Sequence, residues 1–135
     1  MTVSVFLNLY GVAVAAFFAI DLLWLGVVAR PFYLTHLGHL MRANVNWVAA
    51  ITFYLVFVIG IVLLVVSPAV ERHSLTHALV FGALFGLVTY AAYDLTNLAT
   101  LEGFPLQVAI VDLVWGTVLC STVSVVTYLA SLRLM

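Results

Sequence analysis

SVFLNLYGVAVAAFFAIDLLWLGVVA, residues Ser4–Ala29, decides the fold, because it is almost entirely apolar and carries a single charged side chain, Asp21. It exceeds the ~20 residues that an α-helix needs to cross a ~30 Å hydrocarbon core. Arg30 and Pro31 end the run, since proline disfavours helix at the residue before it. The run is also longer than the ~7–15 residues of a signal-peptide core, and no basic segment precedes it. It therefore predicts a retained first membrane-spanning helix.

Three further apolar runs follow, at about 47–67, 75–100 and 105–132. Pro68 is expected to end the first of these, and Pro105 suits the first turn of the last. The chain is 67% hydrophobic and 7% charged, whereas soluble domains are about 25% charged. We predict an all-α fold, a four-helix transmembrane bundle that forms a single integral membrane domain over residues 1–135.

The connection over residues 30–46 has a pattern of its own. Apolar residues alternate there with Arg30, His36, His39 and Arg42 at roughly helical spacing. This pattern predicts a short amphipathic helix that lies in the membrane interface between the first two spans. A simple solvated loop is the alternative.

The charges exclude some partners and leave the orientation open. The net charge is −1, which argues against nucleic acid and against a polybasic lipid-binding surface. The arginines divide equally between the two sides, with Arg30 and Arg42 on one and Arg72 and Arg133 on the other, so the positive-inside rule does not choose an orientation. Cys120 is the only cysteine, so no disulfide within the chain is expected.

Three aspartates lie inside the predicted spans, at Asp21, Asp94 and Asp112. An acid within the bilayer costs ~2.5–3.5 kcal/mol on insertion scales, so three of them need an explanation. Counted from the helix ends at 1.5 Å per residue, each lies roughly 10–13 Å from the side opposite the termini. The sequence therefore predicts one polar cluster at one depth in that leaflet.

Two of these acids have matching neighbours. Asp21 is followed by Trp24, and Asp112 is followed by Trp115, at the same spacing of three residues. Such a spacing places both side chains on one face of a helix. The two motifs run in opposite directions through the membrane, so they are expected to form two halves of one site.

The run over 75–100 has the densest polar end. Gly82, Gly86, Tyr90, Asp94 and Asn97 lie within an arc of about 120° on a helical wheel. Small residues let helices approach closely in lipid. One face is thus expected to pack tightly at one end and to line a polar site at the other, with the neighbouring Tyr93 as part of its wall.

A structural explanation of the acids is a network of hydrogen bonds between helices. Asp94 could accept from Tyr90 or Asn97, and Asp21 from a tyrosine or from a Trp indole. Such bonds contribute only ~0.6 kcal/mol each on average, which is small beside the ~2.5–3.5 kcal/mol insertion cost of each acid. The balance favours a functional site. A crowd of buried carboxyl groups is also expected to keep at least one of them neutral.

His36 and His39 could hold a divalent metal together with an aspartate, because imidazole and carboxylate suit several such ions. Neither His36 nor His39 belongs to an H-x-x-x-H or E-x-x-H pattern, however. We therefore predict no metal site, and the sequence indicates no particular cofactor.

The whole pattern resembles a bacterial family of small four-helix inner-membrane proteins that is classed as a domain of unknown function. Its D-L-x-W motif matches Asp21–Trp24 and Asp112–Trp115, and its Y-D-L-T-N motif matches Tyr93–Asn97. Phe104 stands where tryptophan is expected in that family. The resemblance implies a multi-pass protein of the bacterial inner membrane, and it transfers no catalytic role.

Three functions remain open. The first is a small carrier or solute-binding protein, with an acidic, aromatic-lined pocket for a proton, a cation or a cationic group. The second is a membrane enzyme that acts on a lipid or isoprenoid headgroup, and the third is a structural or accessory subunit. Because four short spans barely enclose a cavity, we also expect a homodimer that uses a small-residue face. The predicted binding residues are Asp21, Trp24, Tyr90, Tyr93, Asp94, Asn97, Asp112 and Trp115.

Overall fold

The computed structural model describes residues 1–135 and contains helices and connections, with no strand. Four helical stretches are long and apolar enough to cross a membrane. This confirms the predicted all-α fold with four spans. The elements are α1 (Val3–Leu23), η1 (Trp24–Val28), α2 (Arg30–Leu37), α3 (Trp47–Ile61), η2 (Val62–Val66), α4 (Ser67–Glu71), α5 (Leu75–Thr100) and α6 (Leu106–Leu134).

Side-chain caps begin three of the spans. Thr2 accepts a hydrogen bond from the backbone N–H of Val5, Asn46 caps α3, and Ser74 caps α5. A side-chain oxygen at this position satisfies one of the backbone N–H groups that a helix start leaves free. These polar residues therefore define where the apolar helices begin.

The second span is longer than its sequence indicates. Pro68 lacks a backbone N–H, and its ring clashes with the carbonyl group four residues earlier in a regular helix. Here the wider π-helical turn η2, which ends at Val66, comes directly before α4. Such turns absorb local irregularities without ending a helix. The helix continues to Glu71, beyond the end expected at Ser67.

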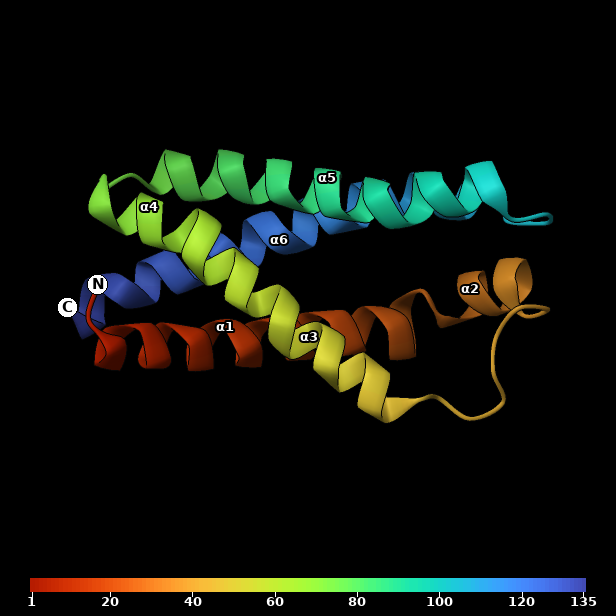
Figure 1. The fold of residues 1–135 in the computed structure, drawn as a ribbon, viewed down its shortest axis with the longest axis horizontal. Helices are drawn as coiled ribbons and strands as arrows, with labels where there is room; N and C mark the ends of the chain where they lie inside the picture. Colours follow the sequence, from red (N-terminus) through yellow and green to blue (C-terminus); the bar gives the residue numbers. More distant parts are fainter.

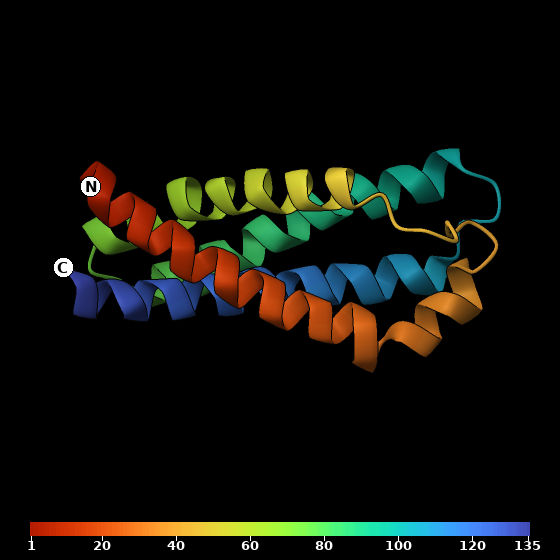
Figure 2. The same ribbon diagram turned by 90° about the horizontal axis from the view of Figure 1, so that it is seen from below.

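The four spans lie roughly side by side, with both termini at one end of the bundle (Figures 1 and 2). Helix α2 and the α5–α6 connection lie at the other end. Helices α5 and α6 pack along each other, α1 packs on α6, and α3 packs on α1. From its contact with α5 at η2, the second span crosses toward α1 (Figure 1). A wedge therefore opens between α3 and α5 toward the end that carries α2.

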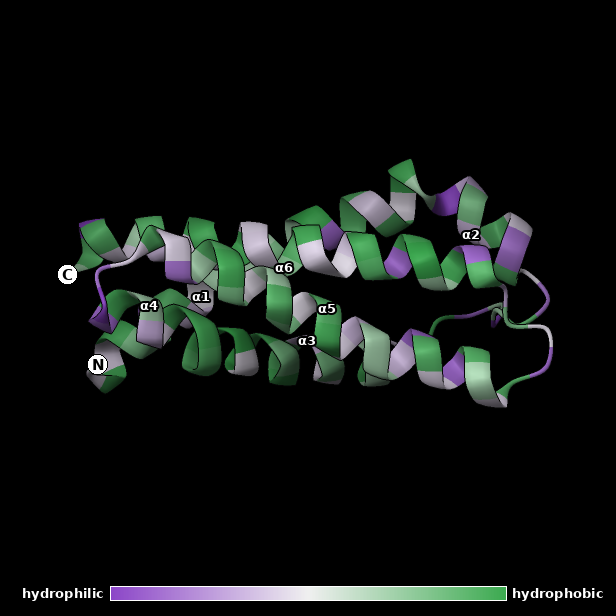
Figure 3. Cartoon of the chain, turned by 90° about the horizontal axis from the view of Figure 1, so that it is seen from above, coloured by the Kyte–Doolittle hydropathy of each residue, from purple (hydrophilic) through white to green (hydrophobic).

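Hydrophobic residues predominate along the helices, as Figure 3 shows, and hydrophilic residues are frequent in the connections. Large apolar side chains such as Val56, Leu64, Val88 and Val114 are exposed. In water such a surface would drive aggregation, whereas in a bilayer it faces lipid. The burial pattern thus fits a chain whose solvent is the membrane.

Small residues bring α5 and α6 close together. A Cβ atom at Gly86 would lie 2.0 Å from the carbonyl oxygen of Gly116, and one at Gly116 would lie 2.3 Å from the Tyr90 ring. The small-residue faces of both helices are therefore used inside the protomer. On α1, by contrast, Gly11 has nothing near its missing side chain. The homodimer stays a prediction.

A helix does form after the first span. It is α2, Arg30–Leu37, and it follows an irregular residue, Ala29, with φ −102° and ψ 0°. Only Tyr33 of α2 is buried, and it points back into the bundle. The position of α2 in the membrane interface remains a prediction.

Cys120 should be protected from modification in the folded protein. It is fully buried between α5 and α6, so a thiol reagent can reach it only when the helices separate. We expect maleimide labelling of the detergent-solubilised protein to be slow and to become complete after denaturation in SDS. A variant with Asn44→Cys and Cys120→Ser carries its thiol on an exposed connection and should label at once. Equal labelling rates for the two proteins would contradict the packing of α5 on α6.

Candidate functional site

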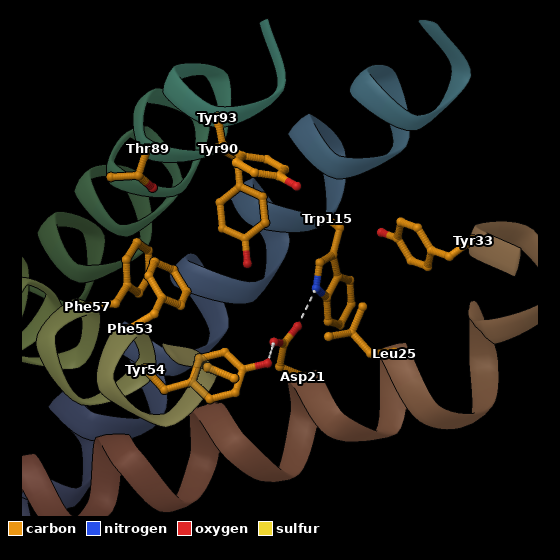
Figure 4. Close-up of a pocket in the computed structure, with 11 residues that line it drawn as sticks. Asp21, Leu25, Tyr33, Phe53, Tyr54, Phe57, Thr89, Tyr90, Tyr93 and Trp115 are labelled. Carbon is orange, nitrogen blue, oxygen red and sulfur yellow. Dashed lines mark hydrogen bonds between the residues drawn. The ribbon is translucent and has the colours of Figure 1, made fainter. Parts of the chain in front are cut away.

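Asp21 lies in the last turn of α1, before the π-helical end of the first span, and is 4% exposed. The hydroxyl of Tyr54 on α3 donates to Oδ2 at 2.6 Å, and the indole Nε1 of Trp115 on α6 donates to Oδ1 at 3.1 Å. Figure 4 shows both bonds converging on the carboxyl group. The expected tyrosine and indole donors to Asp21 are therefore present. Two neutral donors stabilise a carboxylate without neutralising its charge.

A cavity of about 340 Å³ lies beside Asp21, in the wedge between α3 and α5. Asp21 is its only charged lining residue, and most of the others are aromatic. Figure 4 shows the rings of α3 and α5 facing each other across the space, with Trp115 and Asp21 at its base. The lining residues are Asp21, Leu25, Tyr33, Ala50, Phe53, Tyr54, Phe57, Thr89, Tyr90, Tyr93 and Trp115.

The two Asp-x-x-Trp motifs are connected crosswise. The indoles of Trp24 and Trp115 stack with ring centroids 4.2 Å apart and planes 8° from parallel. Trp115 donates to Asp21 on the other helix, while Trp24 Nε1 donates at 3.2 Å to the hydroxyl of Tyr33, which donates to Oδ1 of Asp112. Each tryptophan therefore supports the acid of the opposite motif, one directly and one through Tyr33.

Tyr33 links α2 to this network. It is 9% exposed, and burial raises the pKa of its phenol, with a further increase from the hydrogen bond to Asp112. The hydroxyl therefore keeps its proton at physiological pH and stays a donor. The short helix α2 thus places a neutral phenol over the buried end of α6.

Asp94 and Asp112 form a second polar group, which does not line the cavity and is linked to it through Tyr33. Asp94 is 0% exposed and Asp112 is 9% exposed. Neither oxygen of Asp94 has a hydrogen-bond donor, and the carboxyl group of Asp112 lies within hydrogen-bonding reach of it. Two unprotonated carboxylates are both acceptors and cannot form that bond.

The expectation that Asp94 accepts from Tyr90 or Asn97 is wrong. The Tyr90 ring packs on Gly116 and its hydroxyl points into the cavity (Figure 4). Asn97 lies beside the phenol of Tyr93 instead. Residues that share a helical face can still point to different neighbours, because the neighbouring helices diverge.

The eight predicted binding residues thus fall into separate groups. Asp21, Tyr90, Tyr93 and Trp115 line the cavity. The other four do not: Trp24 stacks behind Trp115, Asp94 and Asp112 pair with each other, and Asn97 lies beside Tyr93.

Four aromatic lining residues were missed in the sequence. Tyr33 lies on α2, and Phe53, Tyr54 and Phe57 lie on α3. The three α3 residues recur at helical spacing, a pattern that is equally typical of rings that pack in a core or face lipid. Tyr33 offers no signal of its own among the other apolar residues of α2.

No group of three or more potential metal-ligating side chains occurs. His36 Nδ1 lies 2.9 Å from the carbonyl oxygen of Phe32, and its ring lies against the Phe32 ring. The His36 side chain therefore contacts the preceding turn of its own helix, α2.

Comparison with known proteins gives one match. The model of a family described as "Predicted membrane protein (DUF2177)" matches residues 6–129. No curated protein and no solved structure matches the chain.

Proposed function

We propose, from the premise that this chain belongs to the DUF2177 family of predicted membrane proteins, that it is a small carrier or solute-binding protein for an organic cation. The observation that carries the proposal is the aromatic cavity of about 340 Å³ with Asp21 as its only charged lining residue. A volume of this size falls in the ~300–1,000 Å³ range of small-molecule sites.

The chemistry of the walls favours a positive charge. The faces of aromatic rings attract cations, most strongly where water is excluded. Phe53, Phe57 and Tyr90 offer such rings, and Asp21 offers a carboxylate whose two donors are neutral. An alkylammonium group in the cavity would meet both attractions, whereas an anion would meet repulsion from Asp21.

The exposure of the lining residues supports lateral entry. Tyr93 on α5 is 61% exposed and Phe53 on α3 is 49% exposed, whereas Tyr54 is 8% exposed. The first two therefore form the rim of the wedge and the third its interior. A solute that partitions into the headgroup region of the leaflet opposite the termini would reach this rim without crossing the bilayer centre.

Isothermal titration of the purified protein with choline and benzyltrimethylammonium tests the proposal. We expect both cations to bind, and we expect Asp21→Asn to weaken them by at least tenfold, which corresponds to about 1.4 kcal/mol. The matched ligand is dimethylbutanol, the neutral isostere of choline in which carbon replaces nitrogen. Its binding should be weaker and should not respond to Asp21→Asn.

Equal affinity for choline and its neutral isostere would refute the proposal, as would unchanged cation affinity in Asp21→Asn. Thr89→Val is a matched control, because it changes a polar lining residue to an apolar one and keeps the carboxylate. The Thr89 hydroxyl already donates to the carbonyl group of Phe85, so this variant should retain cation binding. Uptake of labelled choline into proteoliposomes then distinguishes a carrier from a protein that only binds its solute.

A further inference from the structure

The Asp94–Asp112 pair lies outside the cavity and has no counter-charge. Asp94 is 0% exposed and both of its oxygens lack a donor. The carboxyl group of Asp112 lies within hydrogen-bonding reach of it. A buried polar atom without a partner costs about 1–3 kcal/mol, and more when it is charged. The pair as two bare carboxylates would therefore be strongly unfavourable.

The surrounding elements supply no cation. The titratable groups that act on the pair are the phenol of Tyr33 from α2, the carboxyl group of Asp21 from α1, and the phenols of Tyr90 and Tyr93 from α5. On α3, Tyr54 is directed to Asp21. None of these groups is basic. Two facing carboxyl groups without a cation cannot both ionise.

We propose that Asp94 and Asp112 form a proton-binding site in which the two carboxyl groups hold one proton between them. Asp112 already accepts a hydrogen bond from Tyr33 at Oδ1. A proton on Asp94 makes that carboxyl group a donor to the remaining oxygen of Asp112. This single proton gives Asp94 a hydrogen-bond partner and removes one of the two buried charges. Tyr33 covers the site from α2, the end of the bundle opposite the termini.

The two carboxyl groups lie outside the lining of the cation pocket, and Tyr33 is shared between the pocket and the pair. The proposal therefore does not depend on the proposed function. It requires only that the pair is protonated in the folded protein.

Infrared spectroscopy tests this directly, through the C=O stretching band of a protonated carboxyl group, which shifts when the sample is moved into D₂O. The folded wild-type protein near neutral pH should show a deuterium-sensitive band of this kind. Because the proton is shared, Asp94→Asn and Asp112→Asn should each remove the same component. If the two acids were protonated independently, the spectrum of each variant would instead lose a different component.

Asp21→Asn is the matched control, since it removes a buried acid of the same leaflet that already has two donors. This variant should retain the component that the other two lose. Asp94→Asn is expected to fold, because asparagine imitates a protonated Asp94 and can donate to Asp112. Absence of the band in the wild-type protein would overturn the proposal, as would its survival in Asp94→Asn or Asp112→Asn. Choline titration of the Asp94→Asn sample reports on the pocket separately.

Discussion

Gly86→Ala is expected to lower the free energy of unfolding by about 3 kcal/mol, the upper end of the range for overpacking. The added Cβ would lie 2.0 Å from the carbonyl oxygen of Gly116 and 2.9 Å from Cβ of Cys120. The nearer atom belongs to the backbone and cannot rotate away. Helices α5 and α6 must therefore separate, and every contact along them weakens.

Gly11→Ala is the matched control for this substitution. Gly11 is also inside a membrane span, yet nothing lies within 4 Å of the position of its Cβ. Because alanine is the better helix former by about 0.5–1 kcal/mol, this variant should be neutral or slightly more stable. Unfolding of both variants in mixed micelles with increasing SDS provides the measurement. Equal stability of Gly86→Ala and the wild type would show that α5 and α6 are not packed this closely.

Phe17→Ala is expected to cost about 3 kcal/mol, the lower end of the ~3–5 kcal/mol seen for buried phenylalanine. Phe17 is 0% exposed, and its ring contacts those of Tyr54 and Phe57 at centroid distances of 5.2 and 5.4 Å. The lower end is appropriate because helices in lipid gain packing energy and little hydrophobic transfer energy when they associate.

The loss of Phe17 should also weaken ligand binding in the pocket. The Phe17 ring supports Tyr54, which donates to Asp21, so choline affinity should fall together with stability. Phe81→Ala removes a ring of the same size that is 45% exposed on α5 and should change stability by about 0.5 kcal/mol or less. The prediction fails if the two alanine variants unfold at the same SDS fraction.

The sequence predicted the four spans well, because hydropathy and length alone decide whether a helix can cross a bilayer. It erred at Pro68, where a π-helical turn lets the helix continue to Glu71. A proline inside a helical pattern usually kinks or ends the helix. Nothing in the local sequence distinguishes such a proline from one that a wider turn accommodates.

The sequence predicted where along each span the acids lie, and it did not predict their neighbours. Counting residues from a helix end gives the position of Asp94 or Asp112 along its own helix, whereas it does not give the direction in which each neighbouring helix leans. The decisive contacts join residues far apart in the chain, such as Tyr33 with Asp112 and Tyr54 with Asp21. The Tyr54–Asp21 pair depends on the crossing of α3 over α1, and the Tyr33–Asp112 pair depends on the return of α2 toward α6. No periodicity within one helix encodes either arrangement.

The crossed tryptophans have a mechanical consequence. A slide of α1 along α6 by one turn, about 5.4 Å, would break the Trp115–Asp21 bond and the indole stack together. These contacts fix the register of the two helices, and α5 packs tightly on α6 beside them. Helix α3 is held on α1 by two tyrosine hydrogen bonds, Tyr54 to Asp21 and Tyr10 to the carbonyl group of Leu55, and by the packing of its rings on Phe17. A change in the angle between α3 and the other three spans would therefore widen or narrow the wedge.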